Sequence, residues 1–184
     1  MSKYWVPVGG KGYFWIIKRW FDKYGLNGNG ASVGEIQSNW PETKEVIMEN
    51  YPEIISLNSV DCFYSSDIVW DIVDPYVCEV GNPEIFDFII CQSALEHVWD
   101  PSCAMKNMGN ALVESGLLFI HTHAPGVEYH GYPNDHFRFF EDIFHVWSEK
   151  FNLELLELEW DHNIFALYKK KGPGNWYNIN LKVK

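Results

Sequence analysis

The chain has 184 residues, of which 47% are hydrophobic and 17% aromatic, so it can fold around a core of its own. Its formal net charge of -11 argues against nucleic-acid binding, because neutralising phosphates requires clustered lysine and arginine. No apolar run approaches the roughly 20 residues that a membrane-spanning helix needs, and we expect a cytoplasmic protein with no membrane association.

We expect one domain over residues 1–171, followed by a basic tail over residues 172–184. Residues 1–30 form a helical extension at its N-terminus, with an aromatic-rich helix over 13–24. The four cysteines of the chain contain no CxxC pair, so neither a zinc site nor a disulfide framework is indicated.

In the first half of the chain, helical and extended patterns alternate. After the first helix we predict, in chain order, a strand over 31–36, a helix over 42–50, and strands over 53–57 and 67–70. A proline at position 41 suits the first turn of the second helix. This alternation is typical of an α/β protein.

The second half has the clearest signal. Residues 86–91 form an almost continuous apolar run, as expected for a central parallel strand that is covered on both faces. We then predict a helix over 101–112 ended by Ser115 and Gly116, a strand over 117–120, a helix over 140–151, and antiparallel strands over 153–158 and 163–168.

The order of these elements predicts a Rossmann-like, doubly wound α/β fold. Its sheet is mostly parallel and ends in an antiparallel hairpin at the C-terminus. Ligands of such sheets bind at the carboxyl ends of the strands, so the segments that follow the strands are the candidates for a site.

Three segments in the second half carry a family resemblance. Residues 86–101 read FDFIICQSALEHVWDP, residues 111–118 read ALVESGLL, and residues 129–139 read YHGYPNDHFRF. Together and in this order they resemble the fourth strand, the turn into the fifth strand and the following loop of class I S-adenosylmethionine-dependent methyltransferases, of the type 11-like, small-molecule kind.

The resemblance implies transfer of a methyl group from S-adenosylmethionine, with S-adenosylhomocysteine as the product, to a small-molecule acceptor. A carbohydrate-derived acceptor is one candidate class. The resemblance also places the cofactor against residues that follow the first four strands: Glu35, Gln37, Asn39, Asn58, Asp71, Gln92 and Ser93.

The glycine-rich turn of the family, [DE]xGxGxG, is altered here. Glu35 matches its leading acid, but Gln37, Asn39 and Pro41 occupy the three glycine positions. Glycine lets the backbone approach a ligand closely, asparagine tolerates a left-handed conformation, and proline removes a backbone donor.

Two further cofactor positions have alternatives. Asn58 takes the place of the acid that would hold the ribose hydroxyls, with Asp61 three residues later. Asp71 resembles the acid that reads the adenine amino group, although a turn aspartate closing a strand explains it as well.

Candidate residues for the acceptor half lie after the fourth and fifth strands. His97 and His136 are candidate general bases. The candidates for substrate contact are Glu96, His130, Asp135 and Arg138. For Glu96 and His97, local capping and packing are equally good explanations, and Arg138 also suits a structural pair with Asp135.

Two rival functions stay open. A methyltransferase-like fold without catalysis, acting as a binding or assembly module, would explain the altered glycine turn. A metal-dependent enzyme could use His121 and His123, which share one face of a strand, with the nearby His130, Asp135 and His136. No cysteine or glutamate completes a recognised ligand spacing, so we expect no metal site.

Overall fold

A computed structural model describes residues 14–24, 32–36, 47–51, 54, 56–62, 67–74, 86–131, 134–160 and 162–172. Its helices are α1 (Phe14–Tyr24), α3 (Pro101–Ala111) and α4 (Glu141–Lys150), and residues 47–50 are also helical. Its strands are β1 (Ser32–Ile36), β2 (Ser56–Asp61), β3 (Ile68–Val69), β4 (Phe86–Gln92), β5 (Leu112–His123), β6 (Leu153–Trp160) and β7 (Asn163–Lys170).

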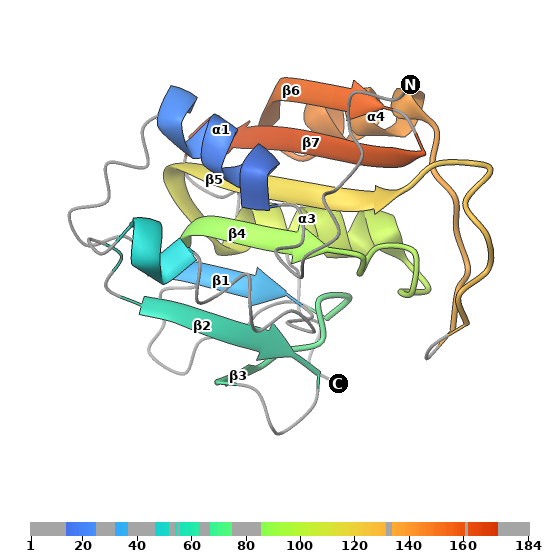
Figure 1. The fold of residues 1–184 in the computed structure, drawn as a ribbon, viewed down its shortest axis with the longest axis horizontal. Helices are drawn as coiled ribbons and strands as arrows, with labels where there is room; N and C mark the ends of the chain where they lie inside the picture. The colour runs from blue at the N-terminus through green and yellow to red at the C-terminus, as the bar shows by residue number, and fades with distance from the viewer. Residues whose placement is uncertain are drawn as a thin grey trace, which may run out of the picture.

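The strands form one sheet in the order β3-β2-β1-β4-β5-β7-β6 (Figure 1). All pairs from β3 to β5 are parallel, and β7 runs antiparallel to both β5 and β6. The predicted mostly parallel α/β sheet with a C-terminal antiparallel hairpin is therefore confirmed. The carboxyl ends of β1 to β5 consequently meet at one edge of the sheet.

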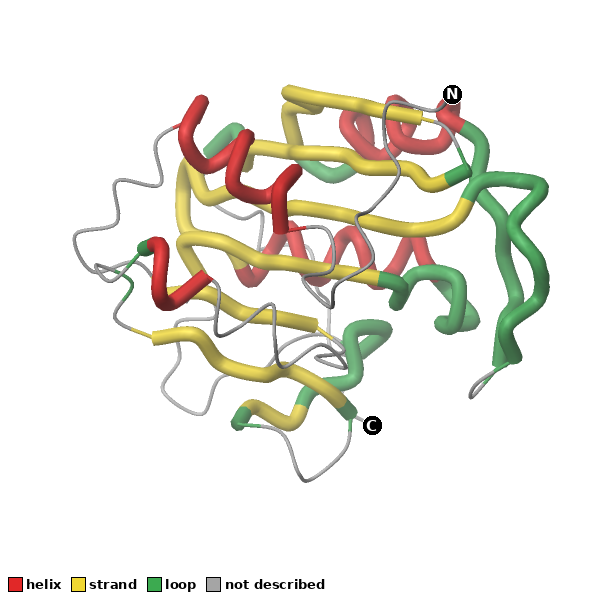
Figure 2. Tube along the Cα trace, viewed as in Figure 1, coloured by secondary structure: helices red, strands yellow, loops and turns green. Residues whose placement is uncertain are grey.

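Strand β4 is the centre of this sheet because its side chains are buried on both faces. Phe88 and Ile90 face α1, whereas Ile89 and Cys91 belong to the cluster that includes residues of α3 and α4. Helix α1 thus covers one face, and α3 and α4 cover the other (Figure 1; Figure 2). The rings of Phe21 and Phe88 meet edge to face with centroids 4.4 Å apart, so α1 is part of the core.

The second strand differs from its prediction over 53–57. Tyr51 and Ile54 still take part in turn hydrogen bonds after the preceding helical residues, with Ile54 N–H donating to the carbonyl of Tyr51 at 3.0 Å. This turn delays the strand, which starts at Ser56 and ends at Asp61. Asn58 therefore lies within β2, opposite Gly34, and Asp61 takes the position at the carboxyl end.

The fifth strand is longer than the predicted 117–120. Helix α3 ends at Ala111, and the irregular turn between Leu112 and Leu117 is built into the start of the strand. Ser115 has a φ of 64°, and a side chain at Gly116 would bring a Cβ within 2.9 Å of the Val113 carbonyl. The extension at the other end places His121 and His123 in the last three residues of β5.

The start of α3 offers a test of local structure. The Asp100 carboxylate accepts a hydrogen bond from the Cys103 N–H at 2.9 Å, and Pro101 occupies the first helical position. We expect Asp100→Ala to lower the free energy of unfolding by about 1 kcal/mol, because it removes this N-cap. Urea denaturation would measure the loss, and Asp100→Ser, which keeps a capping oxygen, should retain most of the stability. Equal losses in both variants would contradict the capping role.

Candidate functional site

The site lies where β4 and β5 end side by side. Gln92, the last residue of β4, is paired with His121 of β5. The loop that follows β5 returns to this edge, where the main-chain N–H groups of His136 and Phe137 donate to the carbonyl oxygen of Glu96 at 2.8 and 3.3 Å. The N–H of Phe139 donates to the carbonyl of His123 at 3.0 Å. The two loops are therefore held together by backbone contacts.

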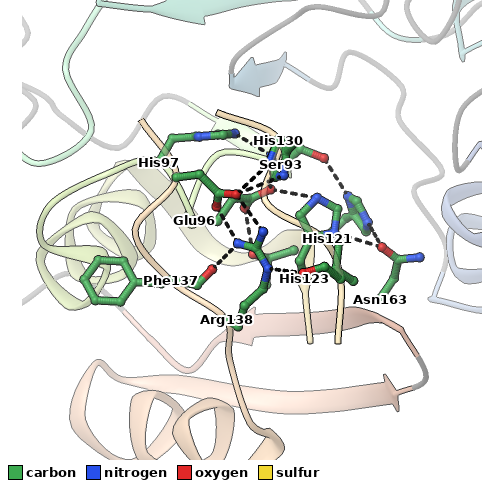
Figure 3. Close-up of polar contacts among 12 residues, drawn as sticks. Ser93, Glu96, His97, His121, His123, His130, Phe137, Arg138 and Asn163 are labelled. Carbon is green, nitrogen blue, oxygen red and sulfur yellow. Dashed lines mark hydrogen bonds and ion pairs between the residues drawn. The ribbon is translucent and has the colours of Figure 1, made fainter. Parts of the chain in front are cut away.

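Glu96 is at the centre of the site and has no exposed surface (Figure 3). One carboxyl oxygen, Oε2, accepts a hydrogen bond from Oγ1 of Thr122 at 2.7 Å. The other, Oε1, lies 3.1 Å from Nε2 of His123 and 3.9 Å from Nε2 of His130. Oε1 makes no hydrogen bond within the described part of the chain. Such an atom calls for a partner, because burying an unpaired polar group is costly.

Three imidazole rings lie at this site: those of His123 and His130 face the Glu96 carboxylate, and that of His97 faces His130. Nε2 of His97 and Nε2 of His130 are 3.1 Å apart, and the ring centroids of His123 and His130 are 4.9 Å apart (Figure 3). His97 comes from the loop after β4, His123 from the end of β5, and His130 from the loop after β5. Glu96, His97 and His130 were predicted to belong to the acceptor site, and the structure brings them together.

The outer nitrogens of these rings face acceptors. Nδ1 of His123 is 3.0 Å from Oδ1 of Asn163. Nδ1 of His130 is 3.2 Å from a carboxylate oxygen of Asp135, and Nδ1 of His97 contacts the carbonyl oxygen of Asn134. Each ring is thereby fixed in its orientation by an oxygen behind it.

His121 is different from the other three. It is fully buried, its Nδ1 is 3.1 Å from the hydroxyl of Ser93, and its Nε2 is 3.1 Å from Oδ1 of Asn163. Burial lowers the pKa of His121 to about 3, so the ring is neutral near neutral pH. Burial likewise lowers the pKa of His123. Since both nitrogens of His121 are engaged, His121 orders Asn163 and Ser93 rather than facing a ligand.

Arg138 holds the loop after β5. Its guanidinium donates to both carboxylate oxygens of Asp135 and to the carbonyl oxygens of Val127, Glu128 and Phe137. These contacts use all five N–H donors, so this conformation leaves none for a substrate anion. The hydrogen bonds from Arg138 hold the pKa of Asp135 well below its usual range. The structural ion pair of Arg138 with Asp135, which the sequence offered as an alternative to substrate binding, is thus present.

Two other predicted residues have distinct environments. His136 contacts Glu96 only through its main chain; its side chain is exposed and its ring lies against that of Phe137, with centroids 6.0 Å apart. Gln92 is 3% exposed, and its side-chain amide has no hydrogen-bond partner among the described residues. A buried amide of this kind is suited to a ligand.

The residues expected to contact the cofactor are described only in part. Glu35 lies in β1, paired with Ser59 and Ile90, but its side chain is not described. Gln37 and Asn39 lie outside the described residues. Asp71 follows β3, is exposed, and accepts a hydrogen bond from the Val73 N–H at 3.2 Å, as a turn aspartate does.

Sequence reasoning missed two partners of this site, Thr122 and Asn163. Asn163 starts β7 and is paired with His123, the last residue of β5. The predicted antiparallel hairpin pairs β6 with β7 and leaves the register of β7 against β5 open, so no signal in the sequence pointed to Asn163.

Arg138 provides the test of how the loop is held. We expect Arg138→Lys to lower the free energy of unfolding by about 2 kcal/mol, because an ammonium group cannot serve both Asp135 oxygens and three carbonyls. Chemical denaturation would measure this loss, with Lys106→Ala, an exposed change in α3, as the control. Unchanged stability of Arg138→Lys would contradict this role.

No family model matches the chain. Solved structures do resemble it. A protein of Galdieria sulphuraria, provisionally assigned as a sarcosine dimethylglycine methyltransferase, has a TM-score of 0.68 at 10% identity over 87% of this chain and 85% of its own. The N-methyltransferase NodS of Bradyrhizobium japonicum, solved with S-adenosyl-L-homocysteine, has a TM-score of 0.55 at 16% identity over 85% and 87%.

A third similar structure is the [4+2]-cyclase SpnF, with a TM-score of 0.64 at 10% identity over 86% of this chain and 81% of that one. These likenesses show that the chain has the class I methyltransferase fold. At such identities they establish the fold and not the activity. Among the described residues, no helix is long and apolar enough to cross a membrane.

Proposed function

We propose that the protein transfers a methyl group from S-adenosylmethionine to a small-molecule acceptor. The observation that carries this proposal is the strand order, which sets the carboxyl ends of β1, β2 and β3 beside those of β4 and β5. We assign the first three ends to the cofactor, and the last two, with their cluster of polar side chains, to the acceptor. Both halves thus lie on one edge of the sheet.

On the cofactor side, acids occupy two useful positions. Asp61 ends β2, where a carboxylate can hold the ribose hydroxyls, and Asp71 follows β3, where it can accept from the adenine amino group. Gln92 ends β4 and Ser93 follows it, and the Gln92 amide, which makes no hydrogen bond to the described residues, supports a role against the methionine part of the cofactor. Glu35, Gln37 and Asn39 are the further residues that the family resemblance assigns to the cofactor.

On the acceptor side, the chemistry mainly requires alignment. Methyl transfer is a displacement at carbon, so holding the acceptor atom in line with the sulfonium methyl supplies much of the rate. His97 and His130 are the reachable members of the cluster, and the side chain of His130 is 37% exposed. Either imidazole could accept the proton of a hydroxyl acceptor, which favours hydroxyl-rich molecules such as carbohydrate derivatives.

The altered glycine turn supports a second candidate, a methyltransferase fold that binds ligands or partners without catalysis. Gln37, Asn39 and Pro41 replace the residues that let the backbone approach the cofactor. The fold is also that of a protein named as a cyclase, so methyl transfer does not follow from architecture alone. Cofactor affinity is the property that separates the two candidates.

Calorimetric titration with S-adenosylhomocysteine and S-adenosylmethionine tests the proposal. We expect micromolar binding of both ligands, weakened at least tenfold by Asp61→Ala and by Asp71→Ala, because each substitution removes an acceptor for the nucleoside. Glu149→Ala, an exposed change in α4, is the matched control and should leave affinity unchanged. If neither ligand binds at millimolar concentration, the proposed methyltransferase activity is wrong, and the second candidate, a fold that binds partners without catalysis, remains.

A further inference from the structure

We propose that Glu96, His123 and His130 bind a divalent transition-metal ion, with His97 as a fourth ligand. The ligand atoms are Oε1 of Glu96 and Nε2 of each imidazole. Glu96, His123 and His130 offer ligand atoms that all lie within 4.8 Å of one another. This site does not depend on methyl transfer, and it goes beyond the proposed function.

The first argument is the proton on each ring. Nδ1 of His123 faces a carboxamide oxygen, Nδ1 of His130 a carboxylate oxygen, and Nδ1 of His97 a main-chain carbonyl oxygen. None of these oxygens carries a proton to donate, so Nδ1 of each ring must be the donor. In a neutral imidazole Nε2 is then left with a lone pair. This arrangement of an outer acceptor behind each ring is the usual support of metal-bound histidines.

The second argument is that these lone pairs converge. Nε2 of His97 and Nε2 of His130 are 3.1 Å apart, a separation that two neutral acceptors do not adopt without a proton or a cation between them. Oε1 of Glu96 is buried and without a hydrogen bond among the described residues, although Nε2 of His123 is 3.1 Å away. An ion bound by Oε1 of Glu96 and Nε2 of His123 and His130 satisfies these three atoms at once, and His97 adjoins the group through Nε2 of His130.

The third argument is distance. Ligand atoms about 2.1 Å from a common ion are separated by roughly 3.0 to 3.4 Å at octahedral and tetrahedral angles. The separation between Glu96 and His123 is 3.1 Å, and that between His97 and His130 is also 3.1 Å. The 3.9 Å between Glu96 and His130 corresponds to a wider angle that a small movement of the loop would close. The cluster is therefore near the dimensions of a coordination sphere.

Asp135 serves as a support and not as a ligand. Both of its carboxylate oxygens accept hydrogen bonds from Arg138, and one also faces Nδ1 and the main-chain N–H of His130. His121 is likewise excluded, because Ser93 and Asn163 occupy its two nitrogens. The site thus differs from the His121–His123 pair considered from sequence, and the glutamate missing from that pattern comes from the loop after β4.

The ligand set indicates the class of metal. Imidazole nitrogens with one carboxylate suit zinc and iron(II), whereas magnesium and calcium prefer oxygen ligands alone. If the proposed function also holds, an ion here would lie on the acceptor side and would activate a hydroxyl by lowering its pKa, in place of His97 and His130 as free bases. That role rests on the proposed function, but the binding of the metal does not.

The test uses the full chain, stripped with a chelator and then titrated with Zn²⁺ in competition with a chromophoric chelator. We expect one equivalent to bind with a submicromolar Kd, and Co²⁺ to give the visible absorption of a low-coordinate nitrogen and oxygen site. His130→Gln should weaken Zn²⁺ binding at least a hundredfold. This variant is preferred because His130 is the most exposed ligand. His145→Gln, on the exposed side of α4, is the matched control.

A second variant and a second readout keep the outcomes separate. Glu96→Gln retains an oxygen for Thr122 but removes the charged ligand, and it should weaken Zn²⁺ to a similar degree; circular dichroism would confirm that both variants fold. Weak Zn²⁺ binding that is equal in the wild type, His130→Gln and Glu96→Gln would show that the proposed metal site is wrong. S-adenosylhomocysteine affinity, measured on the stripped protein, reports on the proposed function independently.

Discussion

The burial of one carboxyl group, that of Glu96, is the constraint on which the functional edge of this protein depends. Its two oxygens face Thr122 and His123 on β5, and its main-chain carbonyl holds the loop through the N–H groups of His136 and Phe137. Removing such a group from water is costly unless it is paired. The hydroxyl of Thr122 supplies a proton to one oxygen, and the imidazoles of His123 and His130 face the other, where a shared cation would compensate the carboxylate.

Much of the architecture could be predicted from sequence because the strongest signals coincide with the most buried elements. The apolar run at 86–91 became the central strand, and the hairpin after residue 153 formed in the predicted antiparallel sense. The start of β2 could not be placed, because hydrogen bonds of Tyr51 and Ile54 prolong the preceding turn and polar residues leave the strand without a clear period. That shift matters chemically, since it moves the terminal position of β2 from Asn58 to Asp61.

The candidate site could be predicted only as a set of loops and residue types. Glu96, His97 and His130 were identified from where they follow strands, whereas Asn163 depends on the register of β7 against β5, which sequence does not specify. Sequence also could not decide whether Arg138 binds a substrate or forms a structural pair with Asp135. A guanidinium suits a substrate anion and a local carboxylate equally well, and only the geometry shows that its donors are all used.

The loop after β5 is attached through the main chain of Glu96 and through Arg138. His130, the histidine of this loop that faces Glu96, takes no part in this attachment through its ring. Main-chain hydrogen bonds persist whatever side chain is present at either partner. The outward residues of this loop can therefore change without disturbing the frame that holds the Glu96 cluster. Variation at the surface of the loop and preservation of the buried cluster are separable in this architecture.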